Sequence, residues 1–128
     1  MSVQMILAVA AGGACGAVGR FLVMSGAGHW LGHGFPYATL IVNIVGSFAL
    51  GALLEISALV WSPPEELRAF LVVGCLGAFT TFSTFSMDTM ALWTRGELVS
   101  AGLYVSVSVI LSIAAFISGM AMFRAILA

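Results

Sequence analysis

The sequence predicts an all-α integral membrane protein with four transmembrane helices. Of its 128 residues, 62% are hydrophobic and only 7% are charged, whereas about a quarter of the residues in a soluble domain are charged. The mean hydropathy is +1.17. A formal net charge of −1 without any lysine excludes nucleic acid as a partner, because such binding needs clustered basic side chains. We therefore expect membrane lipid to surround most of the chain.

Four apolar segments are long enough to cross a bilayer, which takes about 20 helical residues. The chain starts with Met-Ser-Val-Gln-Met-Ile and has no positive charge there, so we expect a retained first span and no cleaved signal peptide. Pro63 and Pro64 should end the second span, and the 3 tryptophans fall at predicted span ends, as interfacial anchors do. The prediction is a single membrane domain, residues 1–128, with spans at about 3–24, 37–60, 65–94 and 98–123.

The third apolar segment is unusual in its middle, at residues 74–85. It reads Gly-Cys-Leu-Gly-Ala-Phe-Thr-Thr-Phe-Ser-Thr-Phe, where an ordinary membrane helix would have Leu, Ile and Val. In hydrocarbon, backbone polar groups are tolerated outside regular helices only where protein or a water-filled path covers them. We therefore predict a break in the third helix, with a polar site beside it.

Polar side chains also form stripes on the second and fourth predicted helices. Thr39, Asn43 and Ser47 are spaced i, i+4 and i+8, which places them on one helix face. They could be packing contacts, since Asn, Ser and Thr often hydrogen-bond across membrane helices and Ser can bond to its own helix. The repeated spacing and the hydroxyls of residues 74–85 favour a continuous polar track. The fourth-helix stripe is Tyr104, Ser108 and Ser112.

The first helix combines small residues with one arginine. Gly12, Gly16 and Gly19 would let another helix approach closely. Arg20 has two interpretations. It is either a surface residue that extends its charge to the interface, or a cation at the mouth of a vestibule that attracts anions.

The arginines are balanced between the two sides of the membrane. With four spans, Arg68 and Arg124 fall on one side, and Arg20 and Arg95 on the other. Orientation is normally set by an excess of Lys and Arg in cytoplasmic loops, and this sequence has no such excess. Either Arg20 is misplaced and buried, or the protein inserts in both orientations and pairs as an antiparallel dual-topology dimer. Because four helices leave little room for an internal cavity, an oligomer is the expected working unit.

Four further polar residues receive no role from the sequence. His29 and His33 have the spacing of two zinc ligands but lack a third. Glu55 lies near the end of the second helix and is expected to face the lipid headgroups. Asp88 lies nearer mid-span and is a candidate vestibule or interface group.

Three motifs resemble those of the CrcB/Fluc family of fluoride-specific ion channels, and the resemblance covers the whole chain. The sequence departs from the family pattern at Phe21, where Tyr is usual, and at Ala38 and Ala78, where Gly is usual. These changes affect packing and one hydroxyl. The motifs are Gly12-Gly13-x-x-Gly16-Ala17-x-x-Arg20-Phe21, then Thr39-Leu40-x-Val42-Asn43-x-x-Gly46-x-Phe48-x-x-Gly51, and Gly74-x-x-Gly77-Ala78-Phe79-Thr80-Thr81-Phe82-Ser83-Thr84-Phe85.

The resemblance implies a passive channel that exports toxic F⁻ across the bacterial inner membrane. Family members are antiparallel homodimers with two fluoride pores. Asn43 would donate an N–H to the anion, while Phe82 and Phe85 would present the positive edges of their rings. Arg20 matches the vestibule arginine of the family. The hydroxyls that would line the path are those of Thr39, Ser83, Thr84, Tyr104, Ser108 and Ser112.

The resemblance also implies a structural Na⁺ at the dimer axis, which is not transported. Backbone carbonyls of Gly77 and Thr80 from both subunits would hold it. A broken membrane helix supplies unpaired carbonyls for such an ion. Because the ligands are backbone atoms, the Ala78 departure need not weaken the site.

Other functions fit the sequence less well. A small dual-topology multidrug or guanidinium antiporter needs a membrane-embedded carboxylate in its first helix, and this first helix has no Asp or Glu. We also expect no enzyme, since the spans hold no Ser/His pair, no zinc-protease His-Glu motif and no phosphate loop. A purely structural subunit would not need a hydroxyl stripe on three helices.

Overall fold

The computed structural model describes residues 2–128, and its regular secondary structure is entirely helical within that range. Four stretches are long and apolar enough to cross a membrane, and the third of them is Glu65–Thr94. The prediction of an all-helical protein with four spans is confirmed at this level. In chain order the elements are α1 (Val3–Leu31), α2 (Tyr37–Leu59), α3 (Glu65–Arg68), the π-helix η1 (Ala69–Leu76), α4 (Gly77–Phe79), α5 (Phe82–Thr94) and α6 (Leu98–Leu127).

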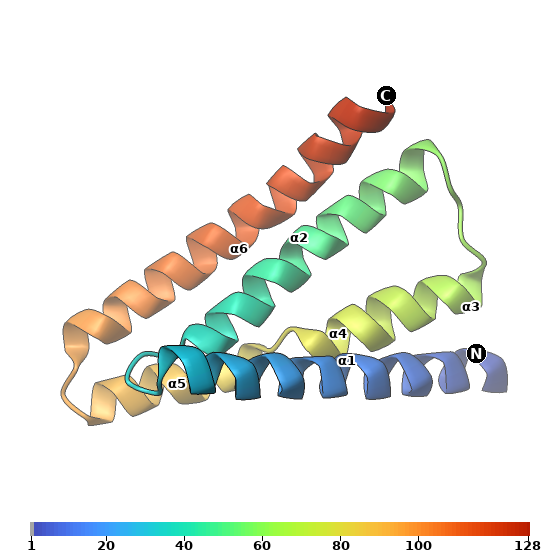
Figure 1. Ribbon diagram of the computed structural model, residues 1–128. Helices are drawn as coiled ribbons and strands as arrows, with labels where there is room; N and C mark the ends of the chain where they lie inside the picture. Colours follow the sequence, from blue (N-terminus) through green and yellow to red (C-terminus); the bar gives the residue numbers. More distant parts are fainter. Residues whose placement is uncertain (1) are drawn as a thin grey trace.

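The helices are arranged as two side-by-side layers. α1 packs against η1 and α4, whereas α2 packs mainly against α6. Figure 1 shows that the two layers meet near α5 and separate toward the end of the molecule where both termini lie. The candidate site lies between the third span and the α2–α6 pair, where residues of all three line a pocket.

Glycines bring the paired helices into backbone contact. A Cβ at Gly16 of α1 would overlap with the Cys75 carbonyl of η1, and one at Gly51 of α2 would overlap with the Phe116 carbonyl of α6. Membrane helices associate through such small residues because lipid supplies no hydrophobic driving force between them. The expected close approach at Gly16 is therefore present.

Two helix ends differ from the sequence expectation. The first helix does not end near residue 24 but continues to Leu31, and the chain turns at Gly32 with a φ of 78°. The fourth span continues to Leu127 instead of ending near residue 123. A glycine inside a helix costs only about 1 kcal/mol, and a backbone near hydrocarbon gains more by keeping its internal hydrogen bonds.

The third span also contains a π-helix of 8 residues, η1. Such segments are rare and are often found at functional sites. Nothing in the residue pattern of 69–76 predicted it. Of the segments in the third span, η1 makes the most extensive contact with α1.

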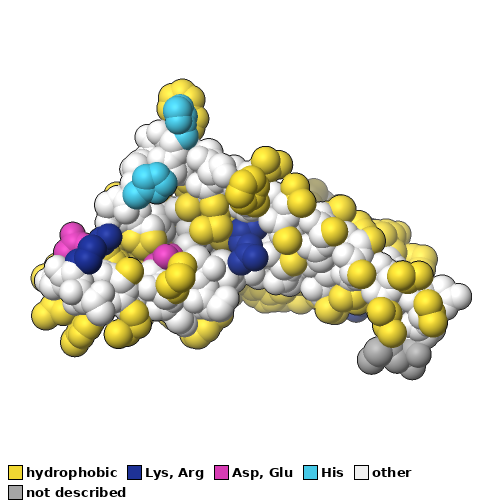
Figure 2. Space-filling view, turned by 90° about the horizontal axis from the view of Figure 1, so that it is seen from below, with side chains coloured by type: hydrophobic (Ala, Val, Ile, Leu, Met, Phe, Trp, Pro, Cys, Tyr) yellow, Lys and Arg dark blue, Asp and Glu magenta, His cyan; other side chains and the backbone are white. Residues whose placement is uncertain are grey.

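The buried core is small. It contains Val42, Leu92 and Tyr104 as its largest apolar side chains, while Phe21 and Phe82 are 67% and 76% exposed. Figure 2 shows a face on which apolar side chains predominate and charged ones are few. Exposed apolar area on this scale is what lipid or a second subunit covers.

Candidate ion pathway

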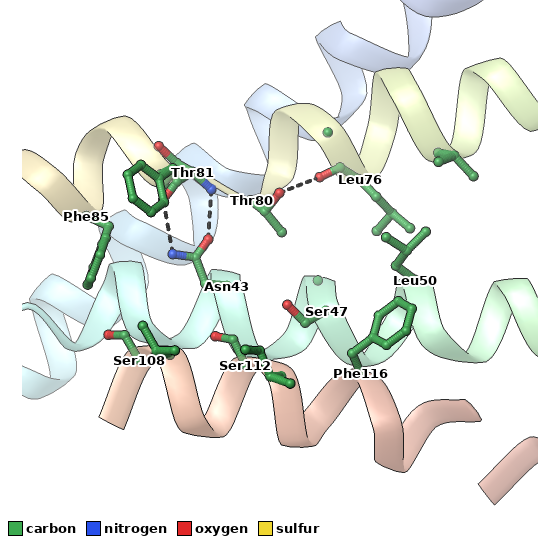
Figure 3. Close-up of a pocket in the computed structure, with 16 residues that line it drawn as sticks. Asn43, Ser47, Leu50, Leu76, Thr80, Thr81, Phe85, Ser108, Ser112 and Phe116 are labelled. Carbon is green, nitrogen blue, oxygen red and sulfur yellow. Dashed lines mark hydrogen bonds between the residues drawn. The ribbon is translucent and has the colours of Figure 1, made fainter. Parts of the chain in front are cut away.

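A pocket of about 390 Å³ lies between the third span and the α2–α6 pair. Within residues 2–128 no Lys, Arg, His, Asp or Glu side chain lines it. Figure 3 shows its polar groups arranged along its length, with Ser108 and Ser112 on α6 opposite Thr81. The pocket brings together these residues predicted for the site: Asn43, Gly77, Thr80, Phe82, Phe85, Ser108 and Ser112.

The backbone is extended where the pocket meets the third span. Thr80 has φ −83° and ψ 159°, and Thr81 has φ −153° and ψ 117°. α5 then begins at Phe82, with the Thr81 hydroxyl accepting a hydrogen bond from the Thr84 N–H at 3.1 Å. Threonine serves this purpose because its side chain can replace a missing backbone acceptor at a helix N-terminus.

Asn43 of α2 holds this extended segment from across the pocket. Its Oδ1 accepts from the Thr81 N–H at 2.7 Å, and its Nδ2 donates to the Thr81 carbonyl at 3.0 Å (Figure 3). The Asn43 amide, which is half-buried in the apolar second span, therefore has the hydrogen-bond partners that a polar group away from water requires. Since Nδ2 has two hydrogens, one remains for a ligand.

These contacts remove the donors that two carbonyls would have in a continuous helix. There the Thr81 N–H would pair with the Gly77 carbonyl, and the Thr84 N–H with the Thr80 carbonyl. Here the first donates to Asn43 and the second to the Thr81 hydroxyl. The carbonyls of Gly77 and Thr80 therefore lack the donors that a continuous helix would give them. The chemistry of the donor set fits the expected Na⁺, because hard cations prefer oxygen.

Aromatic rings continue the site along α5. The centroids of Phe82 and Phe85 lie 5.4 Å apart at 60°, and those of Phe85 and Tyr104 lie 5.2 Å apart at 46°. These are tilted arrangements, in which ring edges are available beside ring faces. Phe82 and Phe85 both line the pocket.

The sequence left Asp88 unassigned, and the structure places it between two predicted pore residues. Its Oδ2 accepts from the Thr39 hydroxyl at 2.6 Å and from the Tyr104 hydroxyl at 3.0 Å. Thr39 and Tyr104 are 1% and 0% exposed and do not line the pocket itself. The sequence could have indicated this role, because Asp88 is a carboxylate inside a membrane span and such a residue almost always has a partner.

The remaining predicted hydroxyls fall into two groups. Ser108 and Ser112 line the pocket, and the buried Ser108 hydroxyl has no hydrogen-bond partner within residues 2–128. Ser83 and Thr84 do not line it. The Ser83 hydroxyl instead lies 3.3 Å from the Thr81 hydroxyl, in the first turn of α5.

Comparison with known sequences identifies the family. The model of the family described as CrcB-like protein, Camphor Resistance (CrcB), matches residues 7–120. The chain belongs to the CrcB family. Among its relatives named fluoride-specific ion channel FluC, that of Rhodospirillum centenum is 54% identical over 121 residues, covering 94% of this chain and 96% of the relative. That of Nitrobacter winogradskyi is 52% identical with the same coverage.

These CrcB relatives are bacterial, and their names describe an ion channel and not an enzyme. Together with four helices that are apolar enough to span a bilayer, they identify this CrcB protein as a multi-pass bacterial membrane protein that is not an enzyme.

The charged residues of this CrcB protein lie outside the pocket. Arg20 is half-buried in α1 and, within the described chain, makes no ion pair. The expectation that Glu55 faces the headgroups is wrong. It is 3% exposed, and its Oε1 lies 2.7 Å from Nε of Arg124 on α6. A buried carboxylate needs such a partner, and the packing of α6 on α2 provides it.

His29 and His33 acquire no third ligand. Among residues 2–128 no group of three or more His, Cys, Asp and Glu side chains could hold a metal ion.

Proposed function

We propose that this CrcB protein is a fluoride-selective passive channel that lets toxic F⁻ leave the bacterial cytoplasm across the inner membrane. The observation that carries the proposal is the pocket at the extended segment. It combines amide and hydroxyl donors with phenylalanine rings, and none of the described side chains that line it is charged. The names of the relatives, fluoride-specific ion channels, agree with it.

The donors of the pocket suit a small, strongly hydrated anion. The free Nδ2 hydrogen of Asn43 and the hydroxyls of Ser108 and Ser112 would replace part of its water shell. The edges of Phe82 and Phe85 would add weaker positive potential. Conduction requires binding that also permits release, and a fixed cation in the path would oppose release. Arg20 would serve at the vestibule, where attraction without tight binding raises the local anion concentration.

We further propose that two chains assemble as an antiparallel homodimer with two pores. The exposed Phe82 ring and the wide apolar faces support a second subunit. The balanced arginines, two on each side, support insertion in both orientations. A two-fold axis would place the same surface of each subunit in contact.

A structural Na⁺ at the dimer axis would be held by the carbonyls of Gly77 and Thr80 from both subunits. Its support is the hydrogen bonding described above, which leaves both oxygens without their helical donors. When bound, the ion would supply positive charge that joins the two third spans.

An efflux assay tests the channel proposal. Purified protein in liposomes should release F⁻ and retain Cl⁻ when an ionophore clamps the membrane voltage. Comparable Cl⁻ efflux would remove the selectivity claim, and no F⁻ efflux would remove the channel. The antiporter alternative remains disfavoured, because α1 has no acidic residue.

A further inference from the structure

The two hydrogen bonds between Asn43 and Thr81 do more than satisfy a half-buried amide. They join α2 to the third span across 38 residues of sequence, at 2.7 Å and 3.0 Å. The partner atoms are the backbone N–H and carbonyl of one residue. Such pairing holds a peptide in the extended conformation, as a neighbouring β-strand would.

Without this pairing, the third span has a competing conformation available. The Thr81 N–H could return to the Gly77 carbonyl and continue α4, since a free backbone donor inside a membrane must find an acceptor. The end of α4 before this point is already fixed, because both the N–H and the hydroxyl of Thr80 donate to the Leu76 carbonyl, at 3.1 Å and 3.0 Å. The acceptor that the Thr81 N–H uses therefore decides between the two conformations.

A second contact acts in the same direction. The Thr81 hydroxyl takes the Thr84 N–H at 3.1 Å, which would otherwise pair with the Thr80 carbonyl. The side chain of Thr81 thus frees one carbonyl, and the amide of Asn43 frees the other. Close approach of α2 at this point depends on Gly46, where a Cβ would overlap with the Thr80 methyl group.

We propose that Asn43 is a positioning residue for the cation site as well as a pore residue. Its amide keeps Thr81 extended, and this leaves the Gly77 and Thr80 carbonyls open to Na⁺. One side chain thereby couples the anion pocket, which it lines, to the ion that joins the subunits. This inference rests on the proposed function for the presence of the Na⁺, and it adds the residue that prepares the site.

Thermal unfolding of the purified protein in Na⁺ or in N-methylglucamine, at equal ionic strength, tests the coupling. Wild-type protein should be stabilised as Na⁺ is added, since a ligand of the folded state raises the midpoint. In Asn43→Ala, the Na⁺ concentration that gives half of this effect should rise by roughly tenfold, a typical coupling between two sites. Ser112→Ala is the matched control. It alters the same pocket without touching Thr81, so its Na⁺ response should stay at the wild-type value even if F⁻ efflux falls.

Thr81 provides a second test if Asn43→Ala does not fold. Thr81→Val keeps the shape and the backbone bonds to Asn43 but removes the hydroxyl, so it should weaken the Na⁺ response in part. Thr81→Ser keeps the hydroxyl, so its Na⁺ response should equal that of the wild-type protein. A wild-type Na⁺ response in both Asn43→Ala and Thr81→Val would overturn the inference and leave the channel proposal intact. No Na⁺ response in wild-type protein would overturn the cation site and this inference together. The channel proposal is tested separately, by F⁻ efflux from liposomes.

Discussion

Replacing Tyr104 by Phe removes one hydroxyl from the hydrogen-bonded group around Asp88 and leaves the ring in place. Tyr104 is 0% exposed and donates to Asp88 Oδ2 at 3.0 Å, so water cannot easily take over the bond. A hydrogen bond between membrane helices contributes about 0.6 kcal/mol on average and up to about 1.7 kcal/mol, and a bond from a fully buried donor such as Tyr104 belongs at the upper end because water cannot replace it. We therefore expect a loss of about 1.5 kcal/mol, or roughly tenfold in the unfolding equilibrium constant.

The shared acceptor gives a second quantity to measure. Thr39 donates to the same oxygen at 2.6 Å, so the effects of Thr39→Val and Tyr104→Phe should not add. Ser108→Ala is the matched control, because the buried Ser108 hydroxyl has no partner within the described residues. Its removal should not lower stability, since an unsatisfied polar group is itself costly, yet it should reduce F⁻ efflux if Ser108 lines the path.

Reversible unfolding by sodium dodecyl sulfate in mixed micelles measures these free energies, and liposome efflux measures transport on the same preparations. The reasoning fails if Tyr104→Phe stays within about 0.3 kcal/mol of wild type, the usual error of additivity. It also fails if the two substitutions add fully, because the hydroxyls would then act on separate partners.

Three further outcomes are expected. Phe82→Ile and Phe85→Ile should each reduce F⁻ efflux by about tenfold or more while size-exclusion chromatography still shows the dimer; wild-type efflux in both would contradict the ring-edge assignment. Arg124→Ala should cost about 1–3 kcal/mol of stability because it leaves the buried Glu55 unpaired. Arg95→Ala should cost only about 0–1 kcal/mol because its partner Glu97 is 46% exposed. Equal losses would show that burial of the carboxylate does not matter. Tags at either terminus should be accessible from both sides of the membrane in intact cells, and accessibility from one side only would exclude dual topology.

The sequence alone determined the membrane class, the four spans and the residues that share a helix face. These follow from composition and from the 3.6-residue period, which are local properties. It also indicated residues 74–85 as the place where something polar meets the third span. The pocket contains five of the nine side chains predicted to line the anion path, namely Asn43, Phe82, Phe85, Ser108 and Ser112.

Only the tertiary structure decided which polar groups meet. The partners of Asn43, Thr39 and Glu55 lie 38, 49 and 69 residues away in sequence. A helix period gives the face on which a side chain lies. It does not give the helix that will cover this face, nor how far that helix is shifted along its axis. Those depend on the close contacts of α1 with η1 and of α2 with α6, which glycines on both surfaces permit. Helix packing therefore decided that Asp88 accepts hydrogen bonds from two hydroxyls and that Glu55 pairs with an arginine, because a buried polar group bonds with whatever partner the neighbouring helix supplies.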